Sequence, residues 1–74
     1  ERSVMFEEHS YKVIEVIGTS EKSWEDAARK VVLDASRSLK DLRVAEVVSQ
    51  DVKIEGSNIV MFRTKLKLSF KLHS

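Results

Sequence analysis

The sequence predicts a single α+β domain in which one strand and one helix precede a long β-hairpin. Three observations predict this order: a β-branched run at residues 11–17, apolar residues at helical spacing from Trp24, and alternation of apolar and polar side chains over residues 60–72. A chain of 74 residues holds one hydrophobic core. The predicted order of elements is therefore β-α-β-β within one domain.

The first strand is expected at residues 11–17 (YKVIEVI), because β-branched side chains favour extended backbone. The run Gly18-Thr19-Ser20 is expected to bound this strand as a turn. Residues 1–10 show no clear period, and we expect them to form an N-terminal tail or a docking arm. The domain itself is expected to span residues 11–74.

The helix is expected over residues 24–40, with Asp41 beyond its end. Ser23 is a good N-cap, and Asp26 completes a box-like S-x-x-D pattern that places a carboxylate at the positive end of the helix dipole. The apolar residues form one stripe at the α period: Trp24, Ala27, Ala28, Val31, Val32, Ala35, Leu39 and Leu42. This face is expected to be buried, with Trp24 as a core anchor and not as a stacking platform.

The hairpin is expected to begin at Leu42 and to turn at Gly56 and Ser57, a two-residue loop that suits a primed hairpin turn. In its second arm one face is apolar apart from a threonine: Val60, Phe62, Thr64, Leu66, Leu68, Phe70 and Leu72. The other face is mostly charged: Met61, Arg63, Lys65, Lys67, Ser69 and Lys71. This alternation predicts a strand with one buried face.

The hairpin is too long for the helix to cover. Residues 42–55 extend about 46 Å, whereas a helix over residues 24–40 is about 26 Å long. Because exposed strand edges and apolar ladders promote association, we expect other copies of the chain to cover the remainder. Val52 and Met61 suit either such an interface or the core, and the sequence leaves both interpretations open.

Composition excludes several classes of protein. Without cysteine, and with His9 and His73 as the only histidines, the domain has no disulfide and no zinc site rich in these residues, so oligomerisation is the remaining way to stabilise it. A formal net charge of +1 argues against a large nucleic-acid footprint. Apolar runs such as residues 31–33 are too short to cross a bilayer, and residues 1–10 lack a secretory pattern. We therefore expect a cytoplasmic protein without nucleic-acid or membrane partners.

No catalytic constellation is recognisable in the sequence. Gly18 and Gly56 are the only glycines, which excludes a P-loop or a dinucleotide-binding fingerprint. His9 and His73 lie close to the two ends of the chain, where a rigidly held catalytic base is not expected. The sequence therefore predicts that the protein is not an enzyme.

Four carboxylates fall in the predicted strands: Glu15, Glu46, Asp51 and Glu55. Beside strand lysines, such carboxylates most often form cross-strand charge pairs. The more specific alternative is calcium binding. Ca²⁺ takes six to eight oxygen ligands, and copies of the chain around a symmetry axis can supply them by each contributing the same carboxylates. Glu46 and Asp51 are the candidate metal ligands.

The run YKVIEVIGTSEKSWEDAARKVV, followed by LRVAEVV, IEG and KLKLSFKL, resembles the dodecin family over residues 11–72. Its most specific elements are Tyr-Lys-Val at 11–13, Gly-Thr-Ser at 18–20, Leu42-Arg43 with Glu46-Val47, and Ser69-Phe70. The resemblance implies a β-α-β-β subunit whose three-stranded antiparallel sheet wraps around its helix. It also implies that twelve copies close into a hollow homododecamer.

Many dodecins hold flavins between subunits, by means of a Trp directly after the Leu-Arg of the second strand and a Gln in the third strand. In this sequence Val44 and Arg63 occupy those two positions. Val44 has no aromatic face, and Arg63 brings a charge where a neutral amide is expected. The segments Ile17-Gly18-Thr19-Ser20 and Ser23-Trp24-Glu25 are more similar to the calcium dodecins. The resemblance therefore implies calcium rather than FMN or riboflavin as the ligand.

Together these features predict a non-enzymatic, homododecameric binding or storage protein for a small ligand or divalent cation, with calcium favoured over flavin. The alternative is a structural or protein-interaction shell with no small-molecule ligand. In a structural or interaction shell, Lys65, Lys67 and Lys71 would recruit a protein or another anionic partner. In a ligand-binding protein, the same lysines would form an ordinary solvated face.

Overall fold

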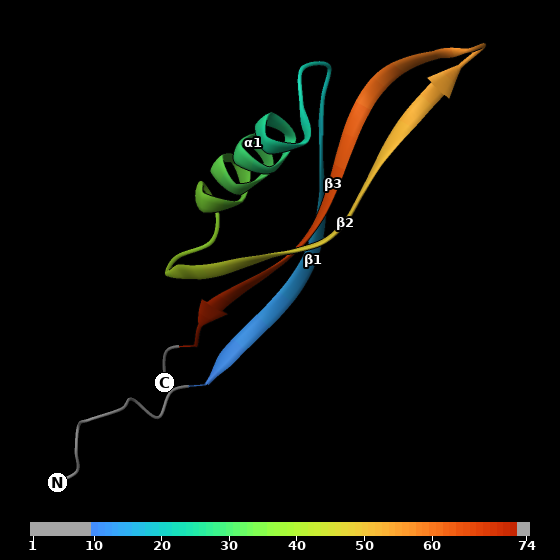
Figure 1. Cartoon of the computed structure of the whole chain (residues 1–74). Coiled ribbons are helices and arrows are strands. Elements are labelled where there is room, and N and C mark those ends of the chain that lie inside the picture. The colour runs from blue at the N-terminus through green and yellow to red at the C-terminus, as the bar shows by residue number, and fades with distance from the viewer. Residues whose placement is uncertain (1–9, 73–74) are drawn as a thin grey trace, which may run out of the picture.

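The computed structural model describes residues 10–72 and has the predicted order of elements, β-α-β-β. The elements are β1 (Tyr11–Ser20), α1 (Trp24–Ser36), β2 (Leu42–Glu55) and β3 (Asn58–Lys71). The strands form one antiparallel sheet in the order β1-β3-β2, and α1 lies over one face of it (Figure 1). The predicted α+β fold is confirmed. The predicted tail, His9 and His73 lie outside the described residues, apart from Ser10.

The core lies between α1 and the central strand β3. Leu66 and Leu68 of β3 and Ala27 of α1 are almost completely buried, while Arg63 and Lys67 on the other face of β3 are exposed. The alternation predicted for this strand is confirmed over these residues. We call the covered side of the sheet the helix face and the opposite side the open face.

The N-terminus of α1 is capped as predicted. The hydroxyl of Ser23 accepts a hydrogen bond from the backbone N–H of Asp26 at 2.9 Å. The Asp26 carboxylate does not complete a reciprocal box, because it accepts a hydrogen bond from Ser20 Oγ at 2.6 Å and pairs with Lys30 at 3.1 Å. These two contacts, the Ser20 bond first, lower the pKa of Asp26. The cap therefore also ties α1 to the end of β1.

The predicted turn at residues 18–20 is wrong, because β1 continues through them. Gly18 pairs with Thr64 and Ser20 pairs with Phe62 in the β1–β3 ladder. A Cβ atom at Gly18 would lie 2.9 Å from Val31 Cβ, and still closer to the Ala27 carbonyl oxygen. The glycine is required for close approach between strand and helix, and not for a turn.

The predicted helix end at residue 40 is also wrong, because α1 ends at Ser36. The backbone N–H groups of Ser38 and Leu39 both donate to the carbonyl of Ala35, which tightens the last turn. Asp41 then adopts a left-handed φ of 60°, and Leu42 begins β2 opposite Phe70. The apolar stripe misled the prediction because Leu39 lies in the loop after α1 and Leu42 begins β2, and both are half-buried without being helical. No helix in the described part of the chain is long and apolar enough to cross a membrane.

The far end of the hairpin has neither a third strand nor a helix beside it. The predicted two-residue loop at Gly56 and Ser57 is confirmed, with Gly56 at a φ of 64°. Because β1 ends opposite Phe62, residues 53–61 form a two-stranded ribbon, which we call the hairpin tip. The tip projects beyond α1 (Figure 1), and the described part of the molecule measures 61 × 21 × 15 Å. The predicted mismatch between helix and hairpin is present.

Replacement of Gly18 by alanine is expected to lower the free energy of unfolding by about 1 to 3 kcal/mol or more, because the added methyl group collides with the backbone of α1. Thr19→Ala, on the exposed side of the same strand, is the matched control and is expected to change it by about 0.5 kcal/mol or less. Urea denaturation followed by the fluorescence of the single tryptophan, at one protein concentration, measures both. Equal losses in the two variants would contradict this packing role.

Candidate functional site

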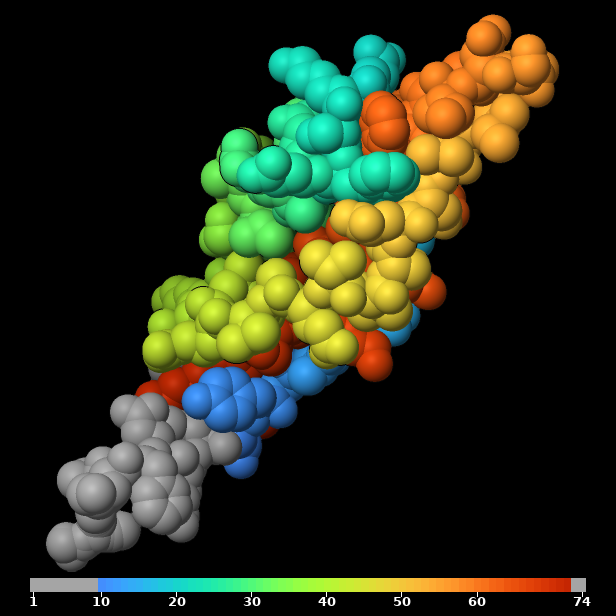
Figure 2. All heavy atoms as spheres, viewed as in Figure 1, coloured from blue at the N-terminus to red at the C-terminus, as the bar shows by residue number. Residues whose placement is uncertain are grey.

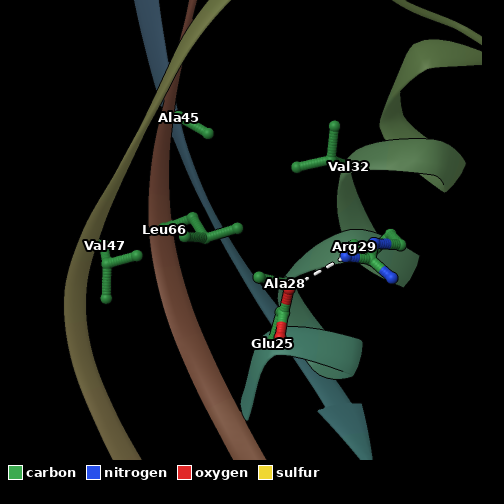
Figure 3. A pocket seen from close by; sticks show the side chains of 7 residues that line it. All are labelled: Glu25, Ala28, Arg29, Val32, Ala45, Val47 and Leu66. Carbon is green, nitrogen blue, oxygen red and sulfur yellow. Dashed lines mark hydrogen bonds and ion pairs between the residues drawn. The ribbon is translucent and has the colours of Figure 1, made fainter.

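α1 packs on β1 and β3 and leaves most of β2 uncovered. The result is an open groove of about 310 Å³ between α1 and β2. Five apolar side chains line this α1–β2 groove: Ala28 and Val32 from α1, Ala45 and Val47 from β2, and Leu66 of β3 (Figure 3). Glu25 and Arg29, which pair with each other at 2.9 Å, lie at its rim. The groove is thus an apolar channel with one acidic and one basic group beside it.

Trp24 holds the start of α1 against the outer edge of β2. Its indole Nε1–H donates to the Asp51 carbonyl at 2.9 Å, and its ring meets Phe62 edge to face at a centroid distance of 5.2 Å. Its own carbonyl accepts a hydrogen bond from Thr64 Oγ1 at 2.9 Å. Trp24 is 37% exposed, so the predicted position in the core is wrong: the side chain anchors α1 at the edge of the sheet.

The open face of the sheet carries rows of charged residues across the strands. One row places Lys67 between Glu15 of β1 and Glu46 of β2. A second row places Arg63 opposite Asp51, and these two side chains form a bidentate ion pair at 2.7 and 2.9 Å. The predicted cross-strand charge pairing is confirmed for Asp51.

The Arg63 guanidinium lowers the pKa of Asp51, chiefly through the hydrogen bonds between them, and Asp51 in turn raises the pKa of Arg63. Both side chains are about half exposed. Asp51 is therefore ionised at neutral pH, and its charge is already compensated by a neighbour. A cation that used Asp51 as a ligand would have to compete with Arg63.

The two candidate metal ligands share a face but do not meet within one chain. Glu46 lies opposite Lys67 and Asp51 opposite Arg63, four residues apart on β3, which corresponds to about 13 Å. Nowhere in residues 10–72 do three or more acidic or histidine side chains come together as a metal site. Since Ca²⁺ takes six to eight oxygens, a calcium site at these residues requires carboxylates from several copies.

The two positions of the flavin-type site are separated in the same way. Val44 lies opposite Ser69 on the open face and is 61% exposed. Arg63 is six residues from Ser69 along β3, or about 20 Å. One chain therefore cannot hold a single flavin ring between Val44 and Arg63.

Lys65, Lys67 and Lys71 lie at alternate positions of β3 on the open face. Lys67 has a glutamate on each side, and Lys65 lies between Ile17 and Ser49. The lysines are therefore part of a surface of mixed charge and not of a uniformly basic one.

Val52 and Met61, for which the sequence left two interpretations, are both half-buried in the single chain. Val52 lies opposite Phe62, while Met61 lies opposite Lys53 in the hairpin tip. Each retains exposed surface that another copy can cover.

An irregularity in β2 decides which carboxylates share the open face. The register between β2 and β3 shifts by one residue between Val47 and Ser49, so Val48 is an extra residue there. Without this shift Glu46 and Asp51, five residues apart, would lie on opposite faces. The two consecutive valines that interrupt the alternation of β2 were the signal that could have revealed it. The groove has no comparable signal in the sequence.

A family model described as Dodecin matches residues 10–73. The calcium dodecin of Mycobacterium tuberculosis is 47% identical over 62 residues, which cover 84% of this chain and 87% of that protein. A crystal structure of calcium dodecin from M. tuberculosis, described as calcium-chelating with a novel calcium-binding site, has a TM-score of 0.78 at 45% identity and covers 86% of this chain and 91% of that chain. The dodecin of Streptomyces coelicolor has a TM-score of 0.87 at 35% identity, covering 93% and 99%.

Replacement of Arg63 by glutamine is expected to raise the pKa of Asp51 towards its ordinary value of 3.8, because the charged hydrogen bonds are lost. Since the folded pKa of Asp51 is lowered, the stability that this pair contributes is present above pH 3.8 and is lost as the pH falls through the folded value. NMR titration of the Asp51 carboxyl carbon measures the pKa. Arg37→Gln, which removes a partner of Asp34, is the control and leaves the Asp51 titration unchanged. An unchanged midpoint in Arg63→Gln would contradict the assignment.

Proposed function

The chain belongs to the dodecin family, and we propose on this basis that it is a non-enzymatic subunit of a closed homo-oligomer that binds a small ligand or ion. Members of this family are binding proteins rather than enzymes. The family resemblance and the β-α-β-β fold expected from the sequence are both confirmed. We further propose that this ligand is calcium rather than flavin, and that residues of the open face hold it.

The observation that carries the proposal is the amount of apolar surface that the single chain leaves exposed. Val44 and Val47 of β2, and Ile54 and Ile59 of the hairpin tip, are each more than half exposed. β2 is an edge strand, and in the hairpin tip β3 has no partner on its other side either within residues 10–72. Burial of such surface against other copies would supply stability that a small core lacks. We propose that the assembly is the hollow homododecamer typical of the family.

Calcium is favoured over flavin for two reasons. The position of the family's stacking tryptophan holds Val44, which has no aromatic face, and Arg63 is engaged by Asp51 instead of presenting a neutral amide. In addition, a relative with 47% identity over most of the chain is called calcium dodecin. We propose that Glu46 and Asp51, contributed by several copies, are the ligands, since carboxylate oxygens suit a hard cation.

Measurement of the native mass is the first test of the proposal. We expect the purified protein at micromolar concentration to have a mass near twelve times 8.5 kDa, since the exposed apolar residues of β2 and the hairpin tip favour association. Native mass spectrometry and sedimentation both measure it. A stable monomer would contradict the proposed assembly and every ligand site that depends on it.

Calorimetric titration of the metal-free assembly tests the ligand. We expect heat of binding with CaCl₂ and none with riboflavin or FMN, and we expect Glu46→Gln to weaken calcium affinity about tenfold or more, because a removed carboxylate costs both charge and an oxygen ligand. Glu55→Gln, in the same strand and paired with Lys53, is the control and should retain the affinity of the parent protein.

If the assembly bound flavin but not calcium, the proposed preference for calcium would be wrong and flavin would be the ligand. Binding of neither by an intact assembly would leave the structural or interaction shell as the function. A salt-sensitive partner lost in a Lys65→Ala, Lys67→Ala double variant would then support that alternative.

A further inference from the structure

Asp51 joins the two faces of the sheet. On the open face its carboxylate accepts two hydrogen bonds from the Arg63 guanidinium, at 2.7 and 2.9 Å. Its backbone carbonyl accepts another hydrogen bond, at 2.9 Å, from the indole Nε1–H of Trp24 in α1. In the space-filling view of Figure 2 the start of α1 (blue-green) lies directly against the middle of β2 (yellow). The residue proposed above as a cation ligand is therefore held by α1 as well as by β3.

Trp24 also contacts both neighbours of Arg63 in β3. The Trp24 ring meets Phe62 edge to face at a centroid distance of 5.2 Å, and the Trp24 carbonyl accepts a hydrogen bond from Thr64 Oγ1 at 2.9 Å. Because side chains alternate along a strand, Phe62 and Thr64 lie on the helix face while Arg63 between them lies on the open face. Trp24 thus contacts the ion-pair partner of Arg63 and the residues on either side of Arg63.

The strand that carries Asp51 needs such support at this point. β2 is an edge strand, and its register with β3 shifts by one residue between Val47 and Ser49, two residues before Asp51. The third strand ends here as well, because Ser20, the last residue of β1, lies opposite Phe62. A further slip of one residue would carry the Asp51 carboxylate to the helix face. The bond from α1 acts against such a slip at the place where the sheet narrows from three strands to two.

The start of α1 is itself fixed, so it can serve as an anchor. Ser23 caps the helix by accepting a hydrogen bond from the backbone N–H of Asp26 at 2.9 Å. The Asp26 carboxylate in turn accepts a hydrogen bond at 2.6 Å from the buried hydroxyl of Ser20. These bonds tie Trp24, the first residue of α1, to the end of β1. The indole therefore reaches Asp51 from a helix end that is held in place.

We propose that Trp24 is a positioning residue for the ion pair of Asp51 and Arg63 and for the cation site at Asp51. From the helix face it holds the Asp51 backbone through the indole N–H, and it thereby fixes where the Asp51 carboxylate lies on the open face. The second part rests on the ligand role proposed above for Asp51, and it adds a residue from the opposite side of the sheet. Because the indole is bonded to the same peptide group, a change in the partner of the carboxylate is registered at Trp24.

The indole N–H signal of the single tryptophan tests this link without any change to Trp24. In proton–nitrogen correlation spectra of the full chain, we expect Arg63→Gln to shift the signal, because the released Asp51 carboxylate changes the position of its own peptide group. Lys67→Gln is the matched control. It removes a charge from the same face of β3, opposite Glu46, and should leave the signal in place. Coincident signals in Arg63→Gln and the parent, or equal shifts in the two variants, would overturn the proposal.

Two variants separate positioning from packing. Trp24→Phe keeps an aromatic ring beside Phe62 but removes the donor to Asp51, whereas Val31→Ala loosens α1 against β1 near Gly18 and keeps the donor. We expect the affinity for CaCl₂ to fall about threefold to tenfold in Trp24→Phe, the range for loss of one net hydrogen bond, and to stay within about twofold of the parent value in Val31→Ala. Calorimetric titration measures the affinity, and urea denaturation followed by circular dichroism measures the stability lost. Affinity losses that follow the lost stability in both variants would overturn the proposal.

Titration of the parent protein with CaCl₂ separates this proposal from the function proposed above. Calcium binding that moves the indole signal supports both. A parent protein that binds no calcium would overturn the cation site, and the response of the indole signal to Arg63→Gln would still decide whether Trp24 positions the ion pair. Calcium binding that leaves the signal unmoved, with the parent affinity retained in Trp24→Phe, would overturn the role of Trp24 alone.

Discussion

The arrangement of this molecule depends on one helix that is shorter than the strands it covers. α1 has 13 residues and is about 20 Å long, whereas β2 and β3 have 14 residues each and extend about 46 Å. The helix is held at its start by Trp24, packs on β1 and β3, and leaves β2 and the hairpin tip without cover. The groove and the projecting tip are two consequences of the same mismatch. Because small domains have little stability to spare, such uncovered apolar surface links folding to association.

The same sheet separates the residues to which a ligand role can be assigned. Val44, Glu46, Asp51 and Arg63 all lie on the open face, but the spacing of residues along a strand separates Glu46 from Asp51 by about 13 Å and Val44 from Arg63 by about 20 Å, so neither pair can act on one ligand within a chain. Any site that combines them is therefore shared between copies. Ligand binding at these residues therefore depends on assembly. The ion pair between Asp51 and Arg63 determines how much of the negative charge on the open face is available to a cation.

Much of the fold could be predicted because its signals are local. Ser23 caps a helix and Gly56 permits a tight turn through the conformations of a few neighbouring residues, and both features are confirmed. The expected turn at Gly18 and the expected helix end at residue 40 are wrong for the opposite reason. Gly18 is required for close contact with α1, and Leu39 lies in the loop after the helix. Neither outcome can be recognised without the residues that lie across the core. Of the candidate site, the family and the residue types could be predicted, but their spacing on the sheet could not.

The sequence alone determined the order of strands and helix, the apolar faces of α1 and β3, the hairpin turn and the family, because these depend on period, on composition and on short motifs. Only the tertiary structure decided that β1 runs through Gly18, that α1 ends at Ser36, and that the extra residue at Val48 places Glu46 and Asp51 on one face. It also decided that Arg63 binds Asp51 and that a groove lies open beside β2. The physical reason is that strand register and the position of the helix on the sheet are set by contacts between residues far apart in the chain, where a shift of one residue exchanges the two faces of a strand.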